Sequence, residues 1–235
     1  METGMKANNV VEWHSQNANT FDNQYNQSTR FMERVTVWSK FIQEFSGTDQ
    51  FAMDIGCGSG ALTFTLAEHN QTVLAVDPSP EMLNLCVQKL SESNKQNITF
   101  KESNLGDAVN HIESPANLIA CSSVIEYLDD IKEQFTLLHN MLEPGGVLLF
   151  SLPNKQSFYR QAEKVIFTLT GKPGYYRYVK NLLSKSEAES ILVDVGFKPL
   201  KSSYYAGTPL LSTWLRPLGL ANRSDNLYLI AAQKL

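Results

Sequence analysis

The fold is decided by the stretch Phe51-Ala-Met-Asp-Ile-Gly-Cys-Gly-Ser-Gly60. Its first five residues are a short, mostly apolar run of the kind that forms a buried β-strand. Glycines follow at every second position, and apolar residues at helical spacing begin with Leu62 and Leu66. The stretch therefore predicts a strand, a glycine-rich turn and a helix, which together form the repeating unit of an open α/β sheet.

Strand and helix patterns continue to alternate up to residue 152. A second strand, Thr72–Val76, leads into Asp77-Pro-Ser-Pro80, where Ser79 can cap a helix and Pro80 can take its first position. Three more apolar strands are expected at 98–100, 118–121 and 147–152. Parallel strands need crossover connections, so we expect a doubly wound parallel sheet with helices on both faces.

Two later strand patterns complete the expected sheet. Phe197–Tyr205 and Asn226–Gln233 are predicted to pair antiparallel at the sheet edge. A helix that opens with a capping box at Ser184–Glu187 and stops at Gly196 precedes them. The predicted fold class is therefore α/β, with a doubly wound, mostly parallel, seven-stranded Rossmann-like sheet and an antiparallel edge strand.

The chain is expected to divide into a flap and one domain. Residues 1–47 are polar and rich in Asn and Gln, with a helix pattern from Phe31 that stops at Gly47, and we predict that they form an N-terminal helical flap. Residues 48–235 form the α/β domain. It is predicted to carry a cap insertion at about 154–183 and an irregular segment at 206–225.

Composition and charge exclude several classes of protein. Twenty Lys and Arg against 24 Asp and Glu in 235 residues give a net charge of −4, which makes nucleic acid an unlikely partner. No apolar run approaches the roughly 20 residues of a membrane-spanning helix. The three cysteines form no CxxC pair, and Met1–Lys6 lacks an apolar leader, so a cytoplasmic location is expected. No feature of the sequence predicts an oligomeric state.

The glycine turn is flanked by two carboxylates that restrict its ligand. Gly56, Gly58 and Ala61 satisfy the dinucleotide pattern G-x-G-x-x-G/A, and Asp77 follows where a ribose-binding acid belongs. However, Asp54 stands where a pyrophosphate would approach, and two like charges at 4 Å repel by about 4 kcal/mol at an effective dielectric of 20. A ligand with a ribose and positive charge fits better, and S-adenosylmethionine is such a ligand.

Three motifs now carry a family resemblance. Residues 51–60, Val73-Leu-Ala-Val-Asp-Pro-Ser-Pro-Glu-Met-Leu83 and Leu142-Glu-Pro-Gly-Gly-Val-Leu-Leu149 occur in the order found in one family. They resemble the motifs of class I S-adenosylmethionine-dependent methyltransferases, particularly the subgroup of ubiquinone/menaquinone-biosynthesis and related small-molecule enzymes. The resemblance covers roughly residues 20 to 200 and is specific for fold and cofactor, not for the methyl acceptor.

The resemblance implies a cofactor site with S-adenosyl-L-methionine as substrate and S-adenosyl-L-homocysteine as product. In it, Arg34 would reach the methionine carboxylate, Asp77 would hold the ribose, and Ser122 would lie on the wall beside the cofactor. The residues implied for the rest of the cofactor are Asp54, Gly56, Cys57 and Gly58 for the methionine part, and Pro78, Met82, Asn104 and Leu105 for the adenine. Asn104 stands where the family often has Asp.

Candidate catalytic residues are fewer. Methyl transfer from a sulfonium needs the acceptor atom aligned near the methyl carbon, and a base only if that atom carries a proton. His14 in the flap is the predicted base, with Tyr25 and Tyr127 as groups that orient the acceptor. Tyr127 replaces the histidine of a family motif that often reads Val-Leu-Glu-His. No His, Cys and Asp cluster has metal spacing, so no metal site is predicted.

The methyl acceptor is expected to bind outside the carboxyl ends of the strands, under a helical cap. Residues 155–185 carry seven basic side chains and one acidic one, an excess of +6, with four interleaved tyrosines. Three interpretations stay open: a solvated basic face, attraction of an anionic or carrier-bound acceptor, and peripheral contact with a membrane. The last rests on an apolar helical stripe formed by Phe158, Ala162, Val165, Ile166 and Leu169, a pattern that also suits plain core.

The sequence therefore predicts a methyltransferase that methylates an oxygen of a small, aromatic or hydrophobic metabolite. N-methylation and RNA methylation are the alternatives within the same class. A non-catalytic S-adenosylmethionine-binding interaction protein is the alternative from another class, because binding and turnover are separate properties of a fold.

Overall fold

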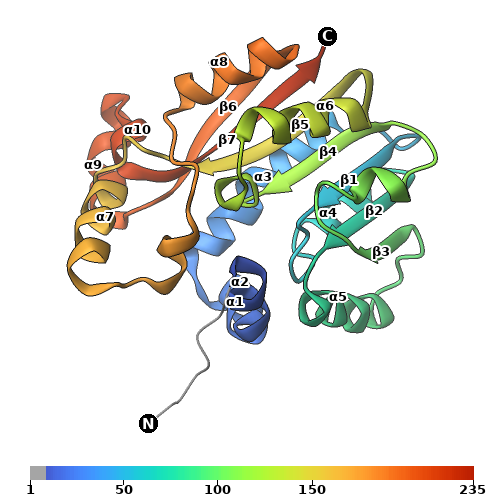
Figure 1. Ribbon diagram of the computed structural model, residues 1–235, viewed down its shortest axis with the longest axis horizontal. Helices are drawn as coiled ribbons and strands as arrows, with labels where there is room; N and C mark the ends of the chain where they lie inside the picture. Colours follow the sequence, from blue (N-terminus) through green and yellow to red (C-terminus); the bar gives the residue numbers. More distant parts are fainter. Residues whose placement is uncertain (1–8) are drawn as a thin grey trace.

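A computed structural model describes residues 9–235 and shows one seven-stranded sheet in the order β3-β2-β1-β4-β5-β7-β6 (Figure 1). All five strands expected between residues 51 and 152 are present, and each pairs in parallel with its neighbours among those five. The strands are β1 (Phe51–Ile55), β2 (Thr72–Asp77), β3 (Ile98–Glu102), β4 (Ala116–Ser122), β5 (Leu142–Pro153), β6 (Phe197–Gly207) and β7 (Asp225–Lys234).

The two late strands pair antiparallel, as predicted. β7 lies between β5 and β6 and runs antiparallel to both, so it is the strand next to the edge, and β6 is the edge strand itself. The mostly parallel, Rossmann-like architecture is confirmed.

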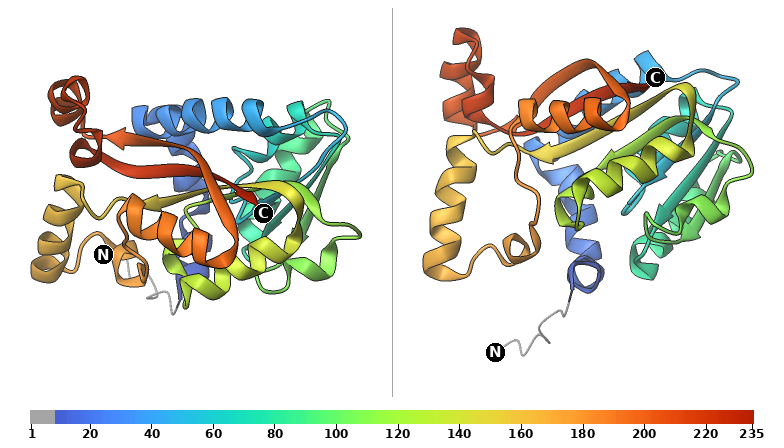
Figure 2. Two further views of the ribbon diagram at one scale, coloured as in Figure 1. Left: turned by 90° about the horizontal axis from the view of Figure 1, so that it is seen from above. Right: turned by 45° about the horizontal axis from the view of Figure 1, so that its top comes forward.

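Helices cover both faces of the sheet, as Figure 2 shows. On one face, α3 (Thr29–Phe45), α4 (Thr63–His69) and α5 (Pro80–Glu92) pack on the strands; on the other, α6 (Ile131–Met141) and α8 (Lys185–Val195) do so. Side chains alternate between these layers because successive residues of a strand point to opposite faces. In β1, for example, Ala52 belongs to the first layer and Met53 to the second.

The helix ends follow the predicted capping chemistry. The Ser79 hydroxyl accepts from the backbone N–H of Met82 at 3.2 Å, with Pro80 as first residue of α5. Ser184 and Glu187 form the expected capping box of α8, and Gly196 ends that helix with φ +100°. These local signals fix where the helices begin and end around the strands.

The predicted flap of residues 1–47 is too long. Only α1 (Val10–Gln16) and α2 (Ala18–Gln27) lie outside the packed layers, because α3 belongs to the core. Trp38 of α3 is fully buried, and its indole Nε1 donates to the Tyr205 hydroxyl at 3.2 Å. The name flap is used below for α1 and α2 alone. The predicted lack of an apolar leader at Met1–Lys6 falls outside the described residues.

The two insertions meet at one end of the molecule (Figure 1). The cap contains α7 (Phe158–Thr170) and a short 3-10 turn, η3 (Gly174–Tyr178). The segment 206–225 was predicted to be irregular, but this prediction is wrong. The segment holds α9 (Pro209–Leu215), a turn at Arg216–Leu218 and α10 (Ala221–Ser224). Its helices are too short for a periodic pattern to reveal. Among residues 9–235, no helix combines the length and the apolar character needed to cross a bilayer.

Candidate active site

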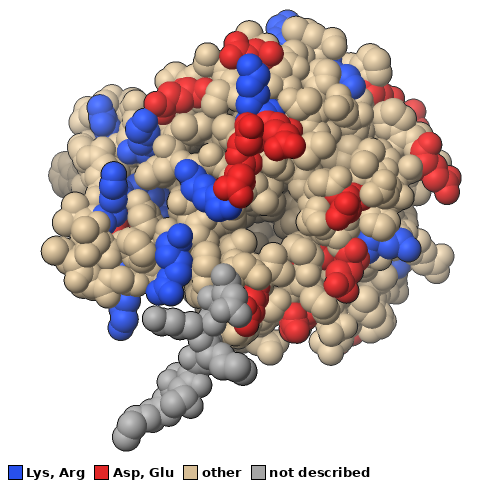
Figure 3. Space-filling view, viewed as in Figure 1, with Lys and Arg blue, Asp and Glu red and all other residues tan. Residues whose placement is uncertain are grey.

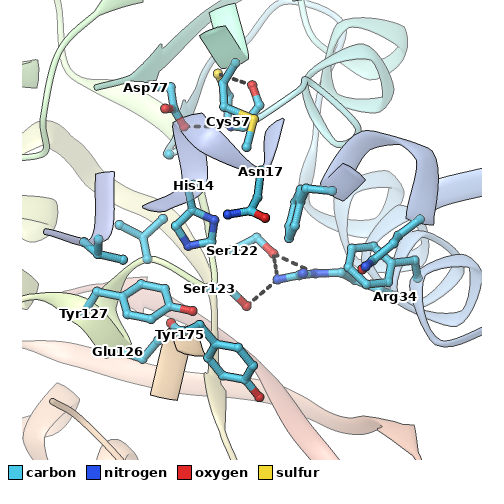
Figure 4. A pocket seen from close by; sticks show the side chains of 18 of the residues that line it. His14, Asn17, Arg34, Cys57, Asp77, Ser122, Ser123, Glu126, Tyr127 and Tyr175 are labelled. Atoms are coloured by element: carbon cyan, nitrogen blue, oxygen red, sulfur yellow. Dashed lines mark hydrogen bonds between the residues drawn. The ribbon is translucent and has the colours of Figure 1, made fainter. Parts of the chain in front are cut away.

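A cavity of about 560 Å³ opens at the carboxyl ends of β1, β2 and β4. The flap, the start of α3 and the cap form its other walls, and Figure 4 shows side chains from these elements pointing into it. Most of the predicted site residues line it: His14, Tyr25, Arg34, Asp54, Gly56, Cys57, Gly58, Asp77, Pro78, Met82, Ser122 and Tyr127. Residues from distant parts of the sequence are thus brought together where open α/β sheets bind ligands.

The glycine turn is fixed by backbone hydrogen bonds. The backbone N–H groups of Gly56 and Cys57 donate to the Val76 carbonyl at 2.8 and 3.0 Å, which ties the turn to β2. Gly56 and Gly58 both have positive φ, +68° and +53°, a region that suits glycine. A Cβ on Gly56 would come within 2.2 Å of Val124, whereas one on Gly58 would meet no atom within 4 Å. Gly56 therefore serves packing, and Gly58 borders the open cavity.

Asp77 is held in place by the turn that it faces. Its carboxylate accepts from the backbone N–H of Gly58 at 2.8 Å and from that of Ser79 at 2.9 Å. Burial raises the pKa of this carboxyl, and the two N–H donors oppose that shift. The side chain is only 8% exposed and lines the cavity, so it is a preorganised acceptor for hydroxyl groups.

Asp54 lies at the floor of the cavity, 1% exposed. The Thr63 hydroxyl donates to its Oδ2 at 2.6 Å. Burial raises its pKa to about 7, opposed by the Thr63 hydrogen bond and increased by the charge of Asp77. Two carboxyls so close to one cavity favour a cationic ligand over a phosphate.

Arg34 supplies the opposite charge. Its guanidinium is buried, and it donates to the Ser122 hydroxyl from Nε at 3.2 Å and from Nη2 at 2.8 Å (Figure 4). Nη2 also donates to the Ser123 hydroxyl. Ser123 has a positive φ of 57°, an uncommon conformation for serine that places this hydroxyl at Arg34. Within residues 9–235 no carboxylate forms an ion pair with Arg34, so a ligand carboxylate fits there.

Two predicted adenine contacts are not brought into the cavity. The Asn104 side chain is exposed and forms a turn with Asp107, donating to its carboxylate at 2.8 Å and accepting from its N–H at 3.0 Å. The Leu105 side chain packs into the buried core next to that turn, and the contact of its backbone N–H with the adenine stays a prediction. On the same side of the cavity, Met82 and Pro78 are lining residues, so an apolar adenine wall exists without the loop after β3.

His14 lies where the flap covers the cavity. Its ring contacts those of Phe21 and Tyr127, with centroids 5.8 and 5.6 Å apart. Burial, and secondarily the charge of Arg34, lowers its pKa to about 4. The imidazole is therefore neutral at pH 7 and can accept a hydrogen bond, but its low pKa makes it a weak base.

The two predicted tyrosines come from different elements of the cavity wall. Tyr25 comes from α2, where its ring packs on Phe21 and Phe31 at 5.8 and 4.9 Å. Tyr127 comes from η2 (Ile125–Tyr127), the turn after β4. Burial raises the pKa of both phenols, so both are neutral hydrogen-bonding groups.

The basic cap segment is largely neutralised. Arg160, Lys155, Lys180 and Lys185 pair with Glu163, Glu187, Asp129 and Glu189 respectively. Lys and Arg side chains gather over the cap end of the molecule in Figure 3, with acidic side chains beside them. Four of the seven basic residues are thus paired, which weakens the attraction of an anionic acceptor. That interpretation stays a prediction.

The apolar stripe of α7 is exposed rather than core. Val165, Ile166 and Leu169 are 59%, 52% and 79% exposed, and Phe158 is 47% exposed. On neighbouring α9, Leu210 and Trp214 are 80% and 76% exposed. Peripheral membrane contact by this face stays a prediction.

Several lining residues escaped the sequence interpretation. Trp13 of the flap contacts Tyr175 of η3, with ring centroids 6.1 Å apart, so the flap touches the cap. Glu126 also lines the cavity but was not predicted as a site residue. It is the glutamate of the Val-Leu-Glu-His family motif, in which Tyr127 replaces the histidine. The tyrosine-rich composition of 175–178 was a signal for the aromatic wall. In the described part of the chain, no group of three or more His, Cys, Asp or Glu is placed to hold a metal.

Comparisons with known proteins agree with this geometry. A methyltransferase-domain family model matches residues 53–148. A ubiquinone biosynthesis O-methyltransferase of Coxiella burnetii is 26% identical over 147 residues, 62% of this chain and 58% of that protein. A tRNA 5-carboxymethoxyuridine methyltransferase of Escherichia coli is 25% identical over 130 residues, 54% of this chain and 50% of that protein. The chain thus matches less than two thirds of the length of these relatives.

Among solved structures, the N-methyltransferase NodS from Bradyrhizobium japonicum WM9, in complex with S-adenosyl-L-homocysteine, superposes with a TM-score of 0.69. It is 17% identical, with 97% of this chain and 99% of that chain covered. The chain therefore has the Rossmann-like fold of class I S-adenosylmethionine-dependent methyltransferases, and the methyltransferase-domain model matches the part of that fold from residue 53 to residue 148. These findings support S-adenosylmethionine as the cofactor and leave the acceptor atom open.

Proposed function

We propose that this chain transfers a methyl group from S-adenosylmethionine to an oxygen of a small aromatic or hydrophobic metabolite. The observation that carries the proposal is one cavity with two chemically different halves. Asp54, Asp77 and Arg34 line one half and match the ammonium, ribose and carboxylate of the cofactor, and Gly58 leaves room beside them. The other half is aromatic and suits a ring-bearing acceptor: Trp13, Phe21, Tyr127, Tyr159 and Tyr175.

The charges in the cofactor half support this donor specifically. Arg34 is a buried cation that pairs with no carboxylate among residues 9–235, and Asp54 is a buried carboxyl that lines the same cavity. An amino acid moiety carries both complementary charges, and its binding would compensate both buried groups. When bound, the cofactor supplies the electrophilic methyl group. The protein's own residues hold it, orient it and exclude water.

The aromatic half favours a small acceptor. The flap covers this half and contacts the cap through Trp13 and Tyr175, so a bulky polymer has little access. Together with the net charge of −4, this opposes RNA as acceptor. Oxygen is favoured over nitrogen by the likeness to the ubiquinone biosynthesis O-methyltransferase, whereas the fold likeness to NodS carries no such argument.

Two measurements test the proposal. Calorimetric titration with S-adenosylhomocysteine and with NADH should show binding of the first and none of the second, because Asp54 repels a pyrophosphate. Transfer of labelled methyl from S-adenosylmethionine is then assayed with phenols, catechols, carboxylates, amines and transfer RNA. Binding of NADH alone would refute the cofactor assignment. Cofactor binding with no transfer to any of these acceptors would support the non-catalytic alternative.

A further inference from the structure

Glu126 is a buried carboxyl in the acceptor half of the cavity. It lies on η2, directly after β4, and is 4% exposed. Its Oε2 has no hydrogen-bond partner, although almost every buried polar atom of a folded protein has one. Figure 4 shows Glu126 beside Tyr127 and Tyr175, on the acceptor side of Ser123.

The turn that carries Glu126 is held rigidly. The backbone carbonyl of Glu126 accepts from the N–H groups of Lys180 and Asn181 at 2.7 and 3.0 Å. The Asn181 side-chain amide donates to the carbonyls of Ile125 and Leu128 at 2.8 and 2.7 Å. The backbone of Glu126 is therefore fixed at the cavity wall by the chain itself, as a preorganised site requires.

The Ser123 side chain hydrogen-bonds this carboxyl, and the other groups around it leave Oε2 without a partner. Arg34 is already bonded to the Ser122 and Ser123 hydroxyls. Arg160 is bonded to Glu163 at 2.6 Å and to the Tyr175 hydroxyl at 3.0 Å. Both guanidinium groups stabilise the charge of Glu126 without forming an ion pair with it. The missing partner is therefore a hydrogen-bond donor that enters the cavity.

We propose that Glu126 accepts the proton of the methyl acceptor, and that the acceptor is thereby an O–H or N–H compound rather than a group without a proton. This inference rests on the proposed function. In the step, a lone pair of the acceptor oxygen or nitrogen forms the bond to the methyl carbon. The carbon–sulfur bond breaks and its electron pair stays on sulfur, which becomes a neutral thioether. The acceptor proton passes to the Glu126 carboxylate, which becomes a neutral carboxylic acid.

The pKa of Glu126 also suits a base. Burial raises the pKa of Glu126 to about 7, opposed by its own backbone N–H, by Arg34 and Arg160, and by the hydrogen bond from the Ser123 side chain. A base acts best when its pKa lies near the working pH, and Glu126 meets that condition better than His14, whose pKa is lowered to about 4. The titratable or charged groups that face Glu126 are Arg34 on α3, Arg160 on α7, Cys121 on β4, Tyr127 on η2, Tyr175 on η3 and Tyr228 on β7.

The test uses Glu126→Gln, which keeps the shape of the side chain and removes the base. Carbon-13 NMR of protein labelled at the glutamate carboxyls, saturated with S-adenosylhomocysteine, should show one signal that titrates near pH 7 and is lost in this variant. Adding phenol, catechol or 4-hydroxybenzoate should shift that signal, and adding anisole should not. Glu143→Gln is the matched control, since Glu143 is half-buried, bonded to Asn117 and outside the cavity.

Turnover gives the second readout. With an acceptor found in the methyl-transfer screen, Glu126→Gln should lower kcat by about 100-fold or more and flatten its rise around pH 7, while the cofactor affinity stays within twofold. A Glu126 signal that ignores all three hydroxyl probes, or a kcat within twofold of wild type, would overturn the inference. Failure of the wild-type chain to bind S-adenosylhomocysteine would instead refute the proposed function, so the two failures are distinguishable.

Discussion

Cofactor affinity should depend on pH through Asp54. In the free protein burial raises the pKa of this carboxyl to about 7, so it is about half protonated at neutral pH. Pairing with the ligand ammonium requires the carboxylate, and binding therefore releases a proton. The ionised fraction is about one eleventh at pH 6 and about ten elevenths at pH 8 for a pKa of 7. The affinity for S-adenosylhomocysteine should thus rise about tenfold, or about 1.4 kcal/mol, over this range.

Titration calorimetry at pH 6, 7 and 8 measures this change directly. Repeating each titration in two buffers of different ionisation enthalpy counts the protons released, about 0.9 at pH 6 and about 0.1 at pH 8. Asp54→Asn should bind more weakly and lose this dependence. Glu126 titrates in the same range, so the comparison is made both in the wild-type chain and in Glu126→Gln. An affinity that falls with rising pH, or a wild-type profile as flat as that of Asp54→Asn, would refute the reasoning.

Three further predictions concern the cofactor half. Asp77→Ala should weaken S-adenosylhomocysteine binding by about 2–3 kcal/mol, because the ribose and the N–H groups of Gly58 and Ser79 lose a charged acceptor; an unchanged Kd would remove Asp77 from the ribose site. Arg34→Lys should weaken binding of S-adenosylhomocysteine but not of methylthioadenosine, which has no carboxylate; equal losses for both ligands would mean that Arg34 does not hold that group. Gly56→Ala should lower Tm more than Gly58→Ala, since its Cβ would clash with Val124, whereas Gly58→Ala should reduce cofactor affinity more; the reverse order would contradict the assigned roles.

The elements that carry local signals were predictable from the sequence. A strand followed by Gly56 and Gly58, and a helix capped by Ser79, are decided by backbone sterics and hydrogen bonds within a few residues. The seven strands and the cofactor half of the cavity follow from such signals. Asn104 was predicted from the family pattern to contact the adenine, but its side chain bonds Asp107 instead.

Other features depend on contacts between distant residues. The burial of Trp38 is decided by its packing against Tyr205, far along the chain, so residue 47 looked like a boundary that the structure does not have. The orphan oxygen of Glu126 exists only because the cap segment around Asn181 holds its turn in place. The apolar stripe of α7 likewise could not be assigned to core or to exposed surface from the sequence, because that depends on whether a distant element covers it.

The position of β7 affects how the protein folds while it is being synthesised. Residues Asp225–Lys234 follow every other strand and helix in chain order, yet they lie between β5 and β6. Until the ribosome releases them, β6 has no hydrogen-bonding neighbour and the apolar edge of β5 is unpaired, a state that invites aggregation. A premature stop codon even a few residues before β7 would therefore divide the sheet. Removing β7 therefore separates β6 from the sheet and exposes β5, which is more than the trimming of an edge.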